Sequence, residues 1–256
     1  MPDFMIAYCG PAAVPADFWM RWNADPLLIA ALAALALVVA SGRSSDARAG
    51  WGAIALMFIV FVSPLCALSS ALFSARVLHH ILLVAAVAPL LARAFPQRHD
   101  SPHHDSPHHD APHHGGTAPL AALVAAHAII LWFWHAPGPY AWGLASVPAY
   151  WLMQLSLLGS AWLMWRAILA PSMQPGPAMM ALAATIGQMG LLGAVIVFAR
   201  TPLYPVHLAS TAAWGLTPLT DQQLAGLLMW VPAMLPYLGV GLWLAWSSLR
   251  PSEPAL

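Results

Sequence analysis

The sequence predicts an all-α fold, a polytopic membrane helix bundle of about seven transmembrane helices with its N-terminus outside. Hydrophobic residues make up 61% of the 256 residues and charged residues only 7%, whereas a soluble domain carries about 25% charged residues. The apolar residues are grouped into long runs, as in a chain that is almost entirely membrane domain. The net charge is zero and lysine is absent, so we expect no nucleic-acid partner.

Seven apolar runs follow the first 25 residues, and a helix needs roughly 20 apolar residues to cross a lipid bilayer. The runs span 26–41, 51–69, 72–95, 118–136, 148–170, 178–199 and 222–247. The first run is short, and Arg76 interrupts the third. Tryptophans such as Trp51, Trp134 and Trp165 lie near the ends of runs, which is typical of the aromatic belts at a membrane surface.

Arginine determines the expected orientation, because cytoplasmic loops carry an excess of positive charge. With seven crossings and an external N-terminus, six of the nine arginines are cytoplasmic, namely Arg43, Arg48, Arg93, Arg98, Arg166 and Arg250. The other three, Arg21, Arg76 and Arg200, fall outside. We therefore predict an external segment at 1–25, a transmembrane bundle at 26–249 and a cytoplasmic tail at 250–256.

A histidine-rich loop is predicted at 96–116, where a unit of Asp, Ser or Ala, Pro, His and His occurs three times. Proline in each unit prevents a helix and the segment offers little apolar surface to bury, so we expect a disordered cytoplasmic loop. Its paired histidines are His103, His104, His108, His109, His113 and His114. They are interpreted either as a weak metal buffer or as the product of repeat expansion in an unconstrained loop.

Two features near the C-terminus concern helix packing alone. Small residues four positions apart allow membrane helices to approach closely. The run at 178–199 holds two such pairs, Ala183 with Gly187 and Gly190 with Ala194. Gln188 lies among them and is expected to make an interhelical hydrogen bond, and Pro232 and Pro236 are expected to kink the last helix.

The predicted orientation brings several ionisable and sulfur-containing side chains to one depth, near the outer surface. Ionisable residues in membrane helices usually face the bundle interior and mark functional sites. The candidate metal ligands are His79, His80, His135, Cys66 and Cys9, with His207 nearby and Met5, Met153 and Met229 as further sulfur donors. Imidazole, thiolate and thioether groups together suit copper, so copper is the expected ion.

Each candidate ligand also has a structural interpretation. His79 and His80 can be buried histidines that satisfy hydrogen bonds, and His135 can cap the end of its helix. Cys66 can serve as a small core residue. Cys9 and Cys66 can instead form a disulfide if both face an oxidising compartment.

The remaining polar residues of this region are expected to have mainly structural roles. Asp221 follows Thr220 at the start of its run and is expected to cap that helix, or else to pair with Arg76 or Arg200. His127 lies about two turns deeper than the other histidines and is expected to be structural. His207 lies in a loop bounded by prolines and is expected to be solvated.

Several stretches resemble the CtaG-type cytochrome c oxidase assembly proteins of bacterial membranes, and the resemblance runs from about residue 8 to 240. They are YCGP (8–11) with RWNADPLL (21–28), SPLCALSSALFSARVLHHILLVAAVAPLL (63–91), WHAPGPY (134–140) and DQQLAGLLMWVP (221–232). The resemblance implies a multi-helix factor of the bacterial inner (plasma) membrane that matures haem-copper oxidase through copper. It also implies cytochrome c oxidase subunits or a copper chaperone as partners.

The chain departs from the pattern of this family at several of its histidines. The family pattern His-Met-x-x-His has Arg76 at its first position here, His80 at its second, and His79 where glutamine is usual. A pair of histidines on the fifth helix is replaced by Tyr150 and Gln154. His135 and Asp221 match the family. We therefore expect either that Cys66 and His79 compensate, or that this branch binds no metal.

The predicted function is assembly of cytochrome c oxidase, by holding or handing over copper at the external face. No residue set resembles an activated nucleophile or a paired acid and base, so no enzymatic turnover is expected. Three alternatives remain: a copper transport protein, a haem-binding membrane protein with His80 and His135 as axial ligands, and a structural scaffold. Arg76, Asp221, Tyr150, Gln154 and Met229 are expected to support or pair with the ligands.

Overall fold

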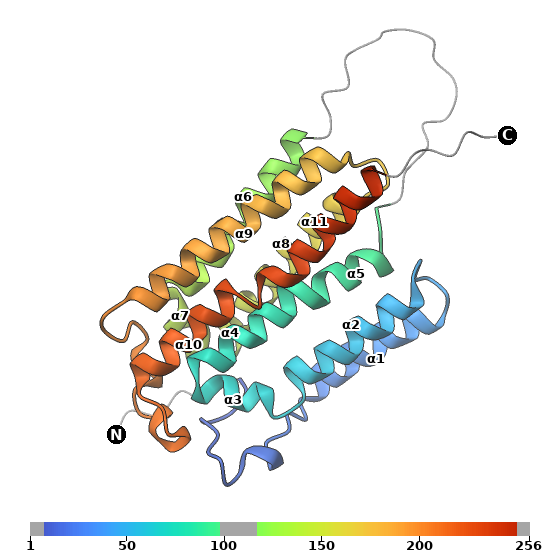
Figure 1. Ribbon diagram of the computed structural model, residues 1–256. Coiled ribbons are helices and arrows are strands. Elements are labelled where there is room, and N and C mark those ends of the chain that lie inside the picture. Colours follow the sequence, from blue (N-terminus) through green and yellow to red (C-terminus); the bar gives the residue numbers. More distant parts are fainter. Residues whose placement is uncertain (1–7, 98–116, 250–256) are drawn as a thin grey trace, which may run out of the picture.

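The computed structural model describes residues 8–97 and 117–249, and this part of the chain is helical without strands (Figure 1). Its α-helices are α1 (Pro26–Ala40), α2 (Ala47–Phe61), α3 (Leu65–Ala71), α4 (Phe73–Ile81), α5 (Ala88–Ala94), α6 (Thr117–His135), α7 (Pro137–Ala145), α8 (Val147–Ile168), α9 (Pro175–Phe198), α10 (Pro218–Trp230) and α11 (Met234–Ser248). A π-helix, η2 (Leu82–Val87), joins α4 to α5. The 3-10 helices are η1 (Phe18–Met20), η3 (Pro205–His207) and η4 (Thr211–Trp214).

Some predictions fall outside these ranges. The histidine-rich loop, apart from Pro96 and Gln97, lies outside the described residues, and so do its paired histidines. The same holds for the tail at 250–256 and for Met5. The metal-buffer role of the loop therefore stays a prediction.

Every predicted apolar run contains a helix, but fewer than seven meet the requirements for a membrane span. Within the described ranges, Phe73–Ala94, Pro175–Phe198 and Pro218–Ser248 are long and apolar enough to cross a membrane. The number rises from 3 to 5 if two bent pairs each form one span, namely α2 with α3, bent by 44°, and α6 with α7, bent by 76°. The all-helical, apolar architecture is thus confirmed, whereas the count of seven and the external N-terminus stay predictions.

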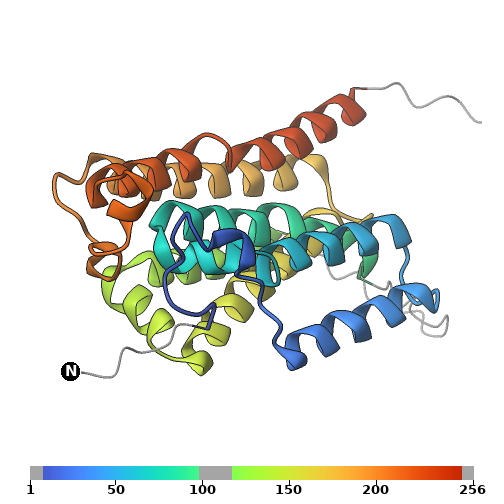
Figure 2. The ribbon, with the colours of Figure 1, turned by 90° about the horizontal axis from the view of Figure 1, so that it is seen from below.

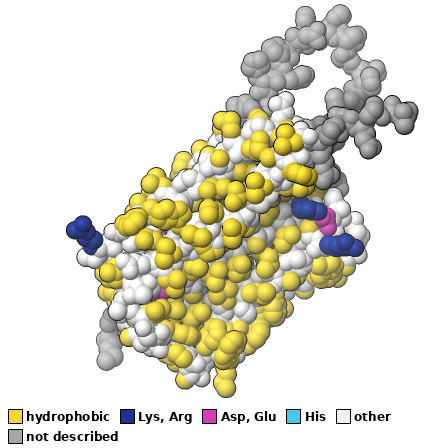
Figure 3. All heavy atoms as spheres, in the orientation of Figure 1, with side chains coloured by type: hydrophobic (Ala, Val, Ile, Leu, Met, Phe, Trp, Pro, Cys, Tyr) yellow, Lys and Arg dark blue, Asp and Glu magenta, His cyan; other side chains and the backbone are white. Residues whose placement is uncertain are grey.

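The long helices run along a common axis, and most connections gather at the two ends of the bundle (Figure 1). We call one end the disulfide end, because Cys9, Cys66 and His207 lie there, and the other the arginine end, after Arg43 and Arg166. On the face drawn in Figure 3, charged side chains gather toward these ends and hydrophobic side chains cover the surface between them. This distribution is the one expected of a bundle surrounded by lipid.

The helix formed by α4, η2 and α5 occupies the middle of the bundle. In Figure 2 it lies between α1 on one side and the α10–α11 helix on the other. Of the 18-residue apolar stretch of this helix, 61% is buried inside the protein. The corresponding share is 39% for α9 and 17% for the α10–α11 helix. The polar residues of α4 are therefore surrounded by protein rather than by lipid.

Prolines and caps explain where several of these helices begin and break. Asp25 caps α1 by accepting a hydrogen bond from the N–H of Leu27 (2.8 Å), and Pro26 follows at the first helical position. A hydrogen bond from Tyr8 lowers the pKa of the Asp25 carboxyl below its usual range. The last helix is interrupted at one of the two prolines predicted to kink it: Pro232 lies in the break between α10 and α11, whereas Pro236 lies inside α11.

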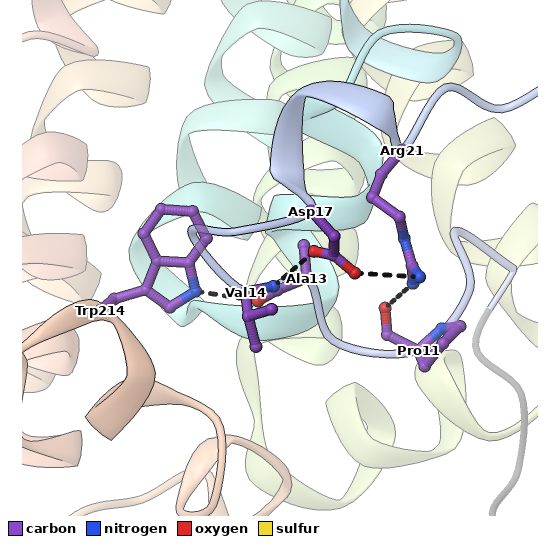
Figure 4. Close-up of polar contacts among 6 residues, drawn as sticks. All are labelled: Pro11, Ala13, Val14, Asp17, Arg21 and Trp214. Carbon is purple, nitrogen blue, oxygen red and sulfur yellow. Dashed lines mark hydrogen bonds and ion pairs between the residues drawn. The ribbon is translucent and has the colours of Figure 1, made fainter.

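The segment before α1 is attached to the disulfide end by polar contacts (Figure 4). The Trp214 indole, at the end of η4, donates a hydrogen bond to the Ala13 carbonyl (3.0 Å). Arg21 donates to the Pro11 carbonyl (2.6 Å) and lies 3.4 Å from Asp17. The bond from Trp214 thus joins the segment before α1 to η4, which precedes α10, at this end of the bundle.

The close approach between helices α9 and α10 involves different small residues from those predicted. A Cβ atom on Gly226 would lie 2.7 Å from the Gly193 carbonyl oxygen and 2.5 Å from a methyl carbon of Val197. Of the predicted small residues, Gly190 does lie against α10, because a Cβ there would be 3.7 Å from Trp230, whereas a Cβ on Gly187 would meet nothing within 4 Å. Four-residue spacing identifies small faces on a helix, but the partner helix decides which face is used.

This crossing makes a direct prediction about stability. Gly226→Ala should lower the free energy of unfolding by about 1–3 kcal/mol, because the added methyl group overlaps backbone that cannot move aside cheaply. Gly187→Ala should leave stability unchanged or raise it slightly, since alanine is the better helix former. Thermal unfolding in detergent, followed by circular dichroism, measures both variants, and equal melting temperatures would contradict the close crossing.

Candidate functional site

Helix α4 carries Arg76, His79 and His80, and all three side chains are at most 2% exposed. The start of α4 is held by Asp221 of α10, whose carboxylate accepts hydrogen bonds from the N–H groups of Phe73 (2.7 Å) and Ser74 (3.2 Å) and from the Ser74 hydroxyl. These N–H groups have no partner within their own helix, because they lie in its first turn. Asp221 therefore fixes α4 against α10.

The predicted role of Asp221 needs a correction on one point. Asp221 is a helix cap, but it caps the neighbouring α4, whereas Thr217 caps the helix α10 that carries Asp221. In the part of the chain that the structure describes, Asp221 forms no ion pair with Arg76 or Arg200. Capping of one helix by a residue of another cannot be recognised from sequence spacing, since Phe73 and Asp221 are 148 positions apart.

Arg76 is a buried cation without a carboxylate partner among the described residues. Its Nε donates a hydrogen bond to the Ser69 carbonyl (3.2 Å), and the guanidinium lies 5.3 Å from the ring centre of Tyr150. Its two terminal nitrogens have no hydrogen-bond partner within the described ranges. A guanidinium is always protonated and cannot ligate a metal, so Arg76 cannot replace the histidine that the resemblance expects at its position.

Three imidazoles from two helices meet beside Arg76. The rings of His80 and His135 have their centres 5.6 Å apart and are inclined at 80°, and the ring of His79 lies 5.9 Å from that of His80. Phe61 contacts the other side of His79 edge-on, with the ring centres 5.1 Å apart. The structure thus brings together the three histidines that the sequence predicted at one depth.

The hydrogen bonds of these imidazoles leave several ring nitrogens unused. His135 Nδ1 lies 2.8 Å from the Leu131 carbonyl, so it carries the proton, and Nε2 has no partner. His80 Nε2 lies 3.4 Å from the Gln154 amide nitrogen, and its Nδ1 has no partner. Neither nitrogen of His79 is paired among the described residues. Buried polar atoms without partners are uncommon in proteins, and each calls for an explanation.

These donors match part of what a copper ion requires. Imidazole is a good copper ligand, and a ring whose other nitrogen donates to a carbonyl is the usual arrangement at metal sites. However, no group of three His, Cys, Asp or Glu side chains in the described ranges has a geometry that could hold a metal ion. The described residues therefore show no metal site, and the copper ligation expected from the sequence stays a prediction.

The two cysteines form a disulfide, one of the alternatives that the sequence left open. Cys9 and Cys66 are bonded with their Cα atoms 5.2 Å apart, and the bond closes a separation of 57 residues. Tyr150 lies beside it, with Oη 3.6 Å from the Cys9 sulfur, and its ring stacks on Tyr8 at 4.7 Å. In this oxidised form neither cysteine supplies a thiolate, so Cys66 does not compensate for the missing histidines.

Two residues of the connection between α9 and α10, Tyr204 and His207, take part in this region although the sequence analysis missed the first and misplaced the second. His207 was predicted to be solvated, which is wrong: it is 2% exposed, and its Nε2 accepts a 2.6 Å hydrogen bond from Tyr140. Burial lowers the pKa of His207 to about 4. Tyr204 donates to the His135 carbonyl (2.7 Å) and stacks on Phe73 at 3.8 Å. Tyr140 belongs to WHAPGPY, whereas no sequence pattern marks Tyr204 or His207.

The polar residues nearer the middle of the bundle are separate from this cluster. His127 Nδ1 lies 2.9 Å from the Ser160 hydroxyl, about two turns along α6 from His135. The predicted interhelical hydrogen bond of Gln188 is confirmed, because Trp132 donates to its side-chain oxygen (3.1 Å). The methionines Met153 and Met229 are buried.

Comparison with known proteins agrees with the resemblance read from the sequence motifs. A family profile described as cytochrome c oxidase caa3 assembly factor (Caa3_CtaG) matches residues 40–251. No curated protein and no solved structure gives a significant match. The family match includes α2 to α11, and hence Arg76 and all the histidines of the cluster. The chain therefore belongs to the Caa3_CtaG family of cytochrome c oxidase caa3 assembly factors.

Proposed function

We propose that this protein resides in the bacterial inner membrane and holds copper for transfer to cytochrome c oxidase, without catalysing a reaction itself. It crosses the membrane seven times with its N-terminus outside, so that the disulfide end faces the external compartment. Oxidase subunits or a copper chaperone are its partners. The disulfide supports this orientation, because disulfides persist in oxidising compartments.

The unused nitrogen of His135 is the observation that carries the proposal. Its Nδ1 is committed to the Leu131 carbonyl, so the lone pair is on Nε2, which is buried and unpaired. The ring of His80 lies next to it and also has an unpaired nitrogen. Leaving such atoms without partners costs folding free energy, about 1–3 kcal/mol for each. A bound ion would offset that cost.

Transport of copper across the membrane is less well supported than assembly at one face. A transport path needs polar groups that continue through the bilayer. The two polar residues nearest the middle, His127 and Gln188, each make a hydrogen bond to a neighbouring helix. They serve helix packing in this conformation, so the polar cluster stays at the disulfide end.

Copper analysis of the purified protein tests the proposal. Wild type loaded with Cu(I) and then desalted should retain about one ion per chain, because two imidazoles suffice for a soft, low-coordinate ion. His80→Ala and His135→Ala should each reduce retention at least about tenfold, since the loss of one ligand leaves a single imidazole. His127→Ala is the matched control, because it removes a buried histidine outside the cluster and should retain copper.

Wild type and each variant should also be measured with residues 99–114 deleted, because copper bound by the predicted metal buffer in that loop would otherwise mask the copper retained by the cluster. Equal copper retention by wild type, His135→Ala and His127→Ala would refute the cluster as the copper site. An absorption spectrum of the protein as purified distinguishes the haem alternative. A Soret band that disappears in His80→Ala would assign the histidines to haem instead of copper.

A further inference from the structure

A second polar site lies at the arginine end of the bundle, away from the histidine cluster. It is a cavity of about 370 Å³ between the α1–α2 connection, the end of α5 and the end of α8. Its polar side chains are those of Arg43, Ser45, Trp162 and Arg166, and the backbone of residues 94–96 forms another wall. Nothing in the proposed copper function uses this cavity.

Two hydrogen-bond donors on the lining residues have no acceptor in the described structure. Arg166 Nε and Trp162 Nε1 are both buried, and neither has a hydrogen-bond partner. The two residues are held together, because the Arg166 guanidinium lies 4.7 Å from the ring centre of Trp162, and Arg166 Nη2 donates to the Pro96 carbonyl (3.3 Å). Buried donors of this kind are normally satisfied, whereas these two N–H groups have no acceptor among the described residues.

The charge around the cavity is positive. Arg43 and Arg166 both line it, and no acidic side chain is among the lining residues that the structure describes. Asp46 of the same connection is engaged elsewhere, since its carboxylate lies 2.8 Å from Arg93 Nη2 and accepts the N–H of Ala49 (3.0 Å). The site thus presents two guanidinium groups, and neither forms an ion pair with a carboxylate among the residues that the structure describes.

We propose that this cavity binds a phosphate group at the membrane surface, carried by the headgroup of an anionic phospholipid or present as free phosphate. Guanidinium groups pair with phosphate oxygens through parallel N–H···O hydrogen bonds, and basic pockets between helices at the cytoplasmic surface suit anionic headgroups. Leu163, which follows the lining residue Trp162 on α8, is exposed and offers apolar surface to an acyl chain. The lipid form of the proposal rests on the membrane placement proposed above, but not on copper.

Native mass spectrometry of the full-length protein in detergent tests the proposal. The probes are phosphatidylglycerol and a diacylglycerol with the same acyl chains, which lacks only the phosphoglycerol group. Phosphatidylglycerol should bind saturably, and Arg166→Gln should weaken it about tenfold or more, the expected loss for hydrogen bonds to a charged group. Trp162→Phe keeps an aromatic ring, removes the N–H and should weaken binding about threefold.

Arg48→Gln is the matched control, because Arg48 lies at the same end of the bundle on α2 but does not line the cavity. It should change binding by less than about twofold, as expected of a distant exposed charge. Equal affinity for diacylglycerol and phosphatidylglycerol, or equal losses in Arg48→Gln and Arg166→Gln, would overturn the proposal. Displacement of the lipid by millimolar inorganic phosphate would identify free phosphate as the ligand, and resistance to it would identify the lipid.

Discussion

Replacing Asp221 by alanine is expected to lower the free energy of unfolding by about 3–5 kcal/mol. The substitution removes the acceptor of three donors at the start of α4, namely the N–H groups of Phe73 and Ser74 and the Ser74 hydroxyl. These groups are buried, so water cannot replace the carboxylate. Circular dichroism in detergent should show a melting temperature about 10 °C below that of wild type.

Ser74→Ala is the control for this prediction, because it removes the hydroxyl contact and leaves both N–H contacts with Asp221. It should cost about 1 kcal/mol. If Asp221→Ala melts at the wild-type temperature, or no lower than Ser74→Ala, then Asp221 does not hold α4 in place. In that case the positions of Arg76, His79 and His80 would have to depend on other contacts.

Loss of the Cys9–Cys66 disulfide is expected to have the second large effect, a destabilisation of about 2–4 kcal/mol. The bond joins residues 57 positions apart and attaches the segment before α1 to the start of α3. Without it the unfolded chain gains conformational freedom, and Tyr8 loses its fixed position against Tyr150. Reduction with a phosphine should therefore lower the melting temperature of the wild-type protein measurably.

A variant with both cysteines replaced by serine separates the effect of the bond from that of the reductant. Its melting temperature should equal that of the reduced wild type, and the reductant should not change it further. If reduction leaves the wild-type melting temperature unchanged while free thiols appear, the disulfide does not stabilise the fold. The stabilisation would then come from the polar contacts of the segment, such as the hydrogen bond from Trp214 to Ala13.

The architecture followed from the sequence because apolar runs of spanning length require helices whatever their partners. The breaks within helices were only partly predictable. Pro232 predicted the break between α10 and α11, since proline lacks an N–H donor. The π-helix η2 was missed. It begins at Leu82, two residues after His80, and its Val84 carbonyl accepts a hydrogen bond from Trp165 of α8. That bond depends on a tertiary contact, which no local pattern reveals.

The site was predictable only in part, and for a similar reason. Ionisable residues in apolar helices are expected to face the bundle interior. His79, His80 and His135 do lie together there. The shared depth of these three histidines could be predicted from the order of the apolar runs. The partners of Asp221 and the burial of His207 could not, because they depend on how distant segments pack. The choice between thiolate and disulfide for the cysteines likewise depended on the distance between Cys9 and Cys66, which spacing alone does not provide.

Recovery of cytochrome c oxidase in living cells tests most directly whether the histidine cluster serves oxidase assembly. Bacteria that lack their own factor of this family would receive wild type, His80→Ala, His135→Ala or His127→Ala, with membrane levels of each protein checked by immunoblot. Oxidase activity of the isolated membranes should return with wild type and His127→Ala, and stay near background with the other two. Full activity with His135→Ala at normal protein level would contradict the account.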